Sequence, residues 1–250
     1  MDVYLAGTSG RRWVVDDQVQ TTKILDIAIL ESFYYADEWL LKAIPKLKRF
    51  LLDSGAFTMF GKGNCVDFEK YTYDYCEFIK QNKIDLFFEM DIDTVTSVEY
   101  AKKLRLIIEK ETGKQPIYVW HPIRGLEEFK NACKEYPYVA ISGTGQFDSA
   151  WIRKKHNHLY WFIDYAHSNG CKIHGLGFTK LNLLPKYHFD SVDSTAWLSG
   201  NRFGHLWHFN GRSMEKIHKG ANQKLKDSKL CAIQNFSEWV KFQEYARKNL

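Results

Sequence analysis

The chain has 250 residues, of which 45% are hydrophobic and 26% are charged, as in an ordinary globular protein. No apolar run approaches the roughly 20 residues of a membrane span, no signal peptide opens the chain, and five scattered cysteines form no CxxC pair, which argues against a zinc knuckle. The net charge of +5 permits a nucleic-acid partner without requiring one, and we expect a protein with no membrane partner in a cytosol-like compartment.

Short apolar runs alternate with amphipathic stretches along most of the chain. Runs of this kind predict buried strands, and apolar residues at helical spacing predict helices. In chain order we predict strand 3–6, helix 23–44, strand 50–52, helix 68–81, strand 85–91, helix 97–111, strand 116–120, helix 126–134, strand 138–141, helix 159–168, strand 171–174, strand 189–194 and helix 236–250. Residues 206–209 are either an eighth strand or part of an insertion.

This alternation predicts parallel βαβ units and therefore an α/β fold. The number of strands and the chain length favour a single closed (β/α)8 TIM-type barrel over an open doubly wound sheet. We expect one domain over residues 1–250, in which residues 196–250 form a basic, aromatic C-terminal elaboration.

Polar residues follow the ends of the predicted strands, and in a barrel these ends meet at one rim. The rim residues are Asp53, Asp91, Asp93, Trp120, His121, Ser142, Gly143, His174, Gly175, Asp190 and Asp193. Carboxylates that converge in one pocket repel, so their pKa values should separate, and one can then act as a nucleophile while another acts as acid or base. This arrangement suits displacement at a sugar anomeric carbon, but also acid–base isomerases and carboxylate-ligated metal enzymes.

One strand end narrows this choice. The segment Asp53-Ser54-Gly55-Ala56-Phe57 resembles the Asp-Ser-Gly-Gly-Phe/Tyr motif of tRNA-guanine transglycosylases, barrel enzymes that exchange a guanine base for a 7-deazaguanine. Residues 91–94, residues 140–143, and residues 173–177 with 189–194 resemble three further segments of that family, in the same order. The similarity runs from about residue 3 to residue 193.

The resemblance implies a role for each matching residue, and it implies no cofactor. Asp193 would be the nucleophile, with Asp190 as the competing candidate, and Asp53 the general acid and base. Asp91, or Asp93 in its place, would accept hydrogen bonds from the base. The remaining base contacts would come from the backbone of Gly143, from stacking by Phe57 and His174, and from Trp120 or His121 in place of a glutamine of the family.

The chain also departs from the tRNA enzymes. It lacks their Cys-x-Cys-x-x-Cys zinc ligands, and Thr195-Ala196-Trp197 replaces their Pro-Thr-Arg. A reduced barrel without metal is more similar to the DNA-modifying branch found in phages and bacterial genomic islands, which inserts bases such as preQ0 into DNA. The resemblance thus implies a DNA-guanine transglycosylase in the cytoplasm of a bacterium or a phage-infected host.

Cations and aromatic residues crowd the last quarter of the chain. We expect four of the cations to bind the DNA backbone, namely Arg202, Arg212, Lys216 and Lys219. An enzyme that reaches the anomeric carbon must extrude the nucleotide, and Trp197, Phe203 or Trp207 would fill the gap. A solvated helical face is the other interpretation of these cations.

Three alternatives stay open. The same reaction could act on tRNA without zinc. A barrel hydrolase or aldolase would need a metal or a Schiff-base lysine, and no strand end carries a lysine. A non-catalytic nucleic-acid-binding barrel would tolerate replacement of Asp53 and Asp193. The sequence also leaves a homodimer and the choice of 7-deazaguanine open.

Overall fold

The computed structural model describes residues 1–19, 25–60, 67–142, 156–178, 180–218, 220 and 227–250. The helices and strands are β1 (Asp2–Ala6), α1 (Trp13–Val19), β2 (Leu25–Ser32), α2 (Glu38–Ala43), β3 (Leu47–Asp53), α3 (Ala56–Phe60), α4 (Phe68–Gln81), α5 (Val98–Thr112), β4 (Tyr118–Trp120), α6 (Leu126–Glu135), β5 (Tyr138–Ser142), α8 (His156–Ser168), β6 (Lys172–Leu176), β7 (Ser191–Ser194), α9 (Ser199–Phe203), β8 (His205–Phe209), β9 (Met214–His218) and α10 (Ser228–Asn249).

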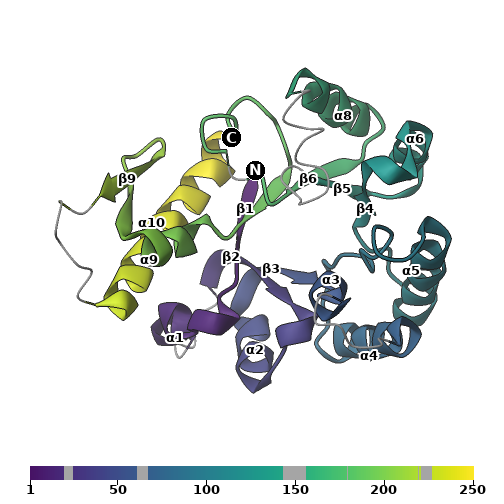
Figure 1. Ribbon diagram of the computed structural model, residues 1–250, viewed down its shortest axis with the longest axis horizontal. Coiled ribbons are helices and arrows are strands. Elements are labelled where there is room, and N and C mark those ends of the chain that lie inside the picture. Colours follow the sequence, from purple (N-terminus) through teal and green to yellow (C-terminus); the bar gives the residue numbers. More distant parts are fainter. Residues whose placement is uncertain (20–24, 61–66, 143–155, 179, 219, 221–226) are drawn as a thin grey trace.

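Seven strands form one parallel, curled sheet in the order β3-β2-β1-β7-β6-β5-β4, with helices around its outer side (Figure 1). The first strand, β1, lies in the interior of the sheet, paired with β2 on one side and with β7 on the other. The register places Asp193 beside Tyr4, and Ser191 beside His174. Because all seven strands run in one direction, their C-terminal ends share one rim, as the sequence predicts.

The two edge strands, β3 and β4, are connected through residues 86–89. Single parallel bridges join Leu52 to Phe87 and Phe88 to Ile117. Beyond them the side chain of Glu89, not a backbone carbonyl, accepts the N–H of Val119 at 2.7 Å. The side chain interrupts the ladder, so these residues form two bridges where the sequence predicts a full strand over 85–91. The α/β class is confirmed, whereas the described elements give a curled seven-stranded sheet and not a ladder of eight strands.

Apolar side chains fill both faces of this sheet. The inner face holds a small cluster drawn from the strands and from the bridged residues next to them, and it includes Tyr4, Leu51, Phe88 and Val119. Two larger clusters pack the outer face against the helices. Burial on both faces explains why the strand sequences are continuous apolar runs instead of alternating ones.

One predicted element is wrong, and one choice between two alternatives is decided. Residues 25–32, within the helix predicted over 23–44, form β2, because a strand buried on both faces has apolar residues at nearly every position and therefore also matches a helical spacing. Residues 206–209 do not join the main sheet: β8 pairs only with β9 in an antiparallel hairpin that packs on α10, so the insertion alternative holds. The helix predicted over 68–81 is confirmed, and Asp67 caps it by accepting the N–H of Lys70.

The last helix, α10, closes the sheet from the side of β1 and β2. The carboxamide of Gln243 donates to the carbonyls of Val3 and Ala28 at 2.6 Å each, and it accepts the N–H of Ala28 at 3.3 Å. One side chain thus completes the backbone pairing where the two strands splay apart. Among the described residues, no helix combines the length and the apolar character needed to cross a bilayer.

Candidate active site

Three carboxylates from different strand ends interact at the rim of the sheet. Asp53 ends β3, Asp91 follows the 86–89 segment, and Asp193 lies on β7. Burial raises the pKa of Asp53 to about 7, and the negative charges of Asp91 and Asp193 add to this effect, while hydrogen bonds from the Gly55 N–H and from Ser32 oppose it. The predicted convergence of these aspartates is therefore present, with one carboxyl that is part protonated at neutral pH.

The turn after Asp53 depends on glycine. Gly55 has a φ of +70°, and its N–H donates to Oδ2 of Asp53 at 3.0 Å. A Cβ at this position would lie 2.3 Å from Oγ of Ser32 and 2.5 Å from Cβ of Tyr34. Only glycine therefore fits both the backbone conformation and the space. The turn leads directly into α3, where Phe57 lies in the first turn.

Asp193 is held from one side. Its Oδ1 accepts the N–H of Gly177 at 2.6 Å and lies 3.3 Å from Nε2 of His174. The carboxylate keeps 15% of its side-chain surface exposed, whereas His174 has none. In this conformation a fully buried ring offers no face for a base to stack on, so the geometry supports a place for His174 beneath Asp193, not against a substrate.

The competing nucleophile candidate lies at the other end of β7. Asp190 precedes the strand, and its Oδ2 accepts the N–H of Ile173 at 2.8 Å and contacts Nε2 of His167 at 3.0 Å. These contacts hold the start of β7 against β6, away from the rim. The geometry therefore favours Asp193 over Asp190 as the residue that faces a substrate.

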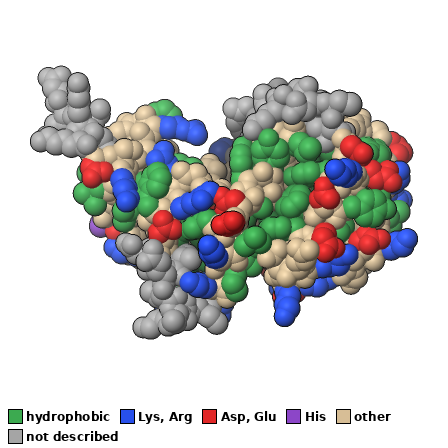
Figure 2. Space-filling model, turned by 90° about the horizontal axis from the view of Figure 1, so that it is seen from below, with side chains coloured by type: hydrophobic (Ala, Val, Ile, Leu, Met, Phe, Trp, Pro, Cys, Tyr) green, Lys and Arg blue, Asp and Glu red, His purple; other side chains and the backbone are tan. Residues whose placement is uncertain are grey.

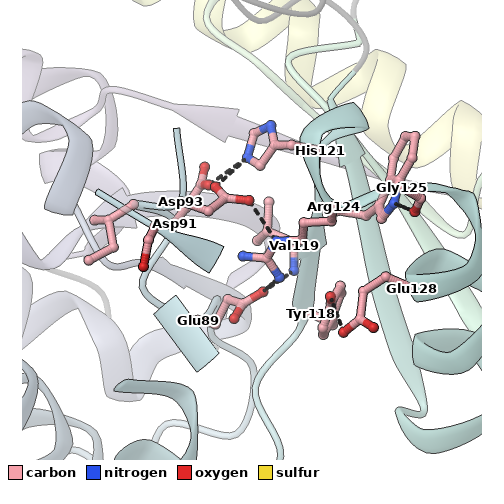
Figure 3. A network of polar contacts seen from close by, with 12 residues as sticks. Glu89, Asp91, Asp93, Tyr118, Val119, His121, Arg124, Gly125 and Glu128 are labelled. Atoms are coloured by element: carbon pink, nitrogen blue, oxygen red, sulfur yellow. Dashed lines mark hydrogen bonds and ion pairs between the residues drawn. The ribbon is translucent and has the colours of Figure 1, made fainter. Parts of the chain in front are cut away.

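Asp91, Asp93 and His121 form a second group at the rim (Figure 3). Nε2 of His121 lies 2.5 Å from Oδ1 of Asp91 and 3.8 Å from Oδ1 of Asp93. The three residues offer ligand atoms within 4.8 Å of one another, a spacing that would accommodate a divalent cation. Asp93, however, is already ion-paired with a cation beneath it.

That cation is Arg124, part of a buried network whose partners the sequence does not identify (Figure 3). Its Nε donates to Asp93 at 2.6 Å and its Nη1 to Glu89 at 2.8 Å, while Arg105 donates to the other oxygen of Glu89 at 2.9 Å. Burial opposes the charged form of Arg124, but Glu89 and Asp93 outweigh it and raise its pKa above the ordinary value. Two cations balance two carboxylates, which fixes Asp93 and leaves Asp91 to face the rim.

One signal in the sequence points to this network. Glu89 stands within the apolar run Leu86-Phe87-Phe88-Glu89-Met90, and a charge inside a buried run requires a partner. The identity of the partners depends on the fold, because Arg105 lies on α5 and Arg124 follows β4.

Some of the remaining predicted contact residues lie among the described residues, and others do not. His121, not Trp120, lies beside Asp91, whereas the indole N–H of Trp120 donates to the carbonyl of Gly125 at 2.8 Å and its ring packs against Phe129. The geometry therefore favours His121 over Trp120 as the side chain beside the rim aspartates. Gly143 and Lys219 lie outside the described residues.

The predicted nucleic-acid contacts lie on α9 and the β8–β9 hairpin. Arg202, Arg212 and Lys216 are exposed, and the ammonium of Lys216 lies 5.1 Å from the ring centroid of Trp207. Basic and acidic side chains are interspersed on the face shown in Figure 2. Trp197 and Trp207 are buried, so they are wrong as gap-filling side chains; Phe203, at 72% exposed, is the one of the three that could serve.

Comparison with known proteins adds no family. No family model matches the chain, and a search of curated proteins finds no match.

Proposed function

We propose that the chain is a base-exchanging transglycosylase that replaces guanine in DNA with a 7-deazaguanine such as preQ0. The observation that carries the proposal is the pair Asp53 and Asp193, two rim carboxylates with different environments. Asp53 has a pKa raised to about 7, so it can both give and take a proton, whereas Asp193 accepts the N–H of Gly177 and keeps part of its surface exposed. The proposal includes a closed (β/α)8 barrel, in which residues 86–89 take the position of the eighth strand.

The two carboxylates would divide the reaction between them. Asp193 would attack C1′ of the nucleotide as the bond from C1′ to N9 breaks, and the departing guanine would take the proton of Asp53. The incoming 7-deazaguanine would then return a proton from N9 to Asp53. Its N9 would form the new bond to C1′ and displace Asp193 from the sugar, which restores both carboxyl groups.

Asp91 and His121 would orient the base. An ionised carboxylate accepts hydrogen bonds only, which suits the N1–H and amino donors of a guanine edge. Arg124 supports this role indirectly, because it neutralises Asp93 and leaves Asp91 as the unneutralised acceptor.

The support for a DNA partner comes from the exposed side chains of the C-terminal part. Arg202, Arg212 and Lys216 would contact phosphates, and Phe203 would fill the gap left by an extruded nucleotide. Phosphate contacts make affinity dependent on salt, so replacement of any of the three cations should reduce that dependence.

The decisive experiment is mass spectrometry of nucleosides from cells that express the protein and are supplied with preQ0. We expect a deazaguanine in DNA; its presence in tRNA alone would replace DNA with tRNA as the substrate. Asp193→Ala should abolish exchange and the trapped covalent adduct, whereas the matched control Asp190→Asn should retain both. Unchanged exchange with Asp193→Ala would refute Asp193 as the nucleophile. Nucleic-acid binding without base exchange by the parent protein would favour a non-catalytic barrel.

A further inference from the structure

A line of hydrogen-bonding side chains leads from Tyr138, at the start of β5, to Asp193. The hydroxyl of Tyr138 lies 2.6 Å from Oγ of Ser191, and that oxygen lies 2.5 Å from Nδ1 of His174. Nε2 of the same ring then faces Oδ1 of Asp193 at 3.3 Å. Tyr4 and Phe88 pack around the imidazole, and His174 and Ser191 are buried, whereas Tyr138 is half-buried.

The protons along this line can be arranged so that each nitrogen and oxygen in it is paired. Burial raises the pKa of Tyr138 well above its ordinary value, so the phenol keeps its proton and can donate it to Ser191. Ser191 then donates its own proton to Nδ1 of His174, and the neutral ring carries its proton on Nε2. The reverse order would turn a nitrogen lone pair toward the carboxylate of Asp193, and would leave the phenol proton without an acceptor in the line.

The two carboxylate oxygens of Asp193 therefore differ in their hydrogen bonds. Oδ1 faces two donors, the N–H of Gly177 and Nε2–H of His174, whereas no described residue donates to Oδ2. A carboxylate held in this way presents one chosen oxygen. Because the imidazole is a neutral donor, it orients the anion without neutralising it. An arginine in its place would neutralise the anion.

We propose that His174 is a positioning residue that aims Oδ2 of Asp193 at the sugar, with its ring nitrogens assigned by Ser191 and Tyr138. This inference rests on the proposed function and deepens it. In the attack, Oδ2 forms the bond to C1′ while the electron pair of the C1′–N9 bond leaves with the base, which is protonated by Asp53. Oδ1 then becomes the carbonyl oxygen of the ester, and its two donors stabilise the carboxylate that must leave in the second step.

The first test needs no substrate. Long-range ¹H–¹⁵N correlation spectra of the full chain report which ring nitrogen of a histidine is protonated, and the signal missing in His174→Gln assigns the residue. We expect the Nε2–H form in the parent protein, and a mixture of both forms in Ser191→Ala. A parent protein with the proton on Nδ1 would overturn the proposed proton order, whether or not the protein exchanges bases.

The second test is kinetic and uses preQ0 with a DNA duplex. His174→Phe should lower kcat by roughly 100-fold, the cost of losing one aligned donor, with KM for preQ0 changed by less than about 2-fold. His174→Gln, which retains an N–H donor, should recover at least roughly a tenth of the parent kcat. A raised KM with an unchanged kcat in His174→Phe would indicate a base-stacking ring and refute the positioning role. Failure of the parent enzyme to exchange any base would instead refute the proposed function.

Discussion

Removal of the Asp53 carboxylate should change how the free energy of unfolding depends on pH. The pKa of Asp53 rises from an ordinary value of 3.8 to about 7, chiefly through burial and then through Asp91. Between about pH 4 and pH 7 the folded protein therefore holds a proton on Asp53 that the unfolded chain releases, so the contribution of Asp53 to stability is greatest below this window and is lost as the pH rises through it. At about 1.4 kcal/mol for each pH unit, the loss is at most about 4 kcal/mol, because water at the rim screens part of it.

Asp53→Asn removes this titration without removing the side-chain volume. Urea unfolding between pH 4.5 and pH 8 should show a flatter profile for the variant, which becomes the more stable protein above pH 7. The matched control is Asp74→Asn, an exposed aspartate on α4, whose profile should run parallel to that of the parent. A parallel profile for Asp53→Asn as well would refute the argument, because it would mean that the three rim carboxylates do not share a buried site.

Three further changes test the parts that support the site. Arg124→Met should cost about 3–5 kcal/mol in urea unfolding at neutral pH, because two buried carboxylates lose a partner; a stabilised variant would contradict the network. Gly55→Ala should lower stability by at least twice as much as the control Gly113→Ala, which should cost about 1 kcal/mol. Both glycines have positive φ, but only at Gly55 do other atoms occupy the position of the added methyl group. Equal losses would show that the space at Gly55 is not limiting. Gln243→Leu should cost about 3 kcal/mol because it leaves three buried backbone groups unpaired. The control Gln234→Leu, on the exposed side of the same helix, should be within about 0.5 kcal/mol of the parent. Similar losses in the two variants would argue against a stabilising role for the Gln243 hydrogen bonds.

The sequence predicts the rim better than it predicts the sheet. Asp53, Asp91 and Asp193 come together because parallel strands end at a common edge, a rule that needs strand positions and no detail of packing. The strand Leu25–Ser32 could not be separated from a helix, because full burial removes the alternation that marks a strand. The sequence leaves residues 206–209 as an eighth strand or an insertion for another reason: a short apolar run does not say which sheet it joins.

Side-chain roles were harder to predict than positions. His174 follows the pattern of a substrate contact in the sequence, but the register beside Ser191 turns its ring into the interior. Arg124 and Glu89 are 35 positions apart and meet only after β4 is placed beside residues 86–89. Such partnerships depend on the register between strands, and one sequence alone does not contain that information.

The position of α10 has a consequence for how the chain folds. The first strand pairs with β7, nearly 190 residues away, and its remaining backbone group is satisfied by Gln243. During synthesis β1 leaves the ribosome well before α10 and must wait for this helix before its pairing is complete. Contacts of such long sequence separation slow folding and leave sheet edges open meanwhile. The order of synthesis therefore opposes the order of assembly, because β1 and β2 gain the contacts of Gln243 only once α10 has been made.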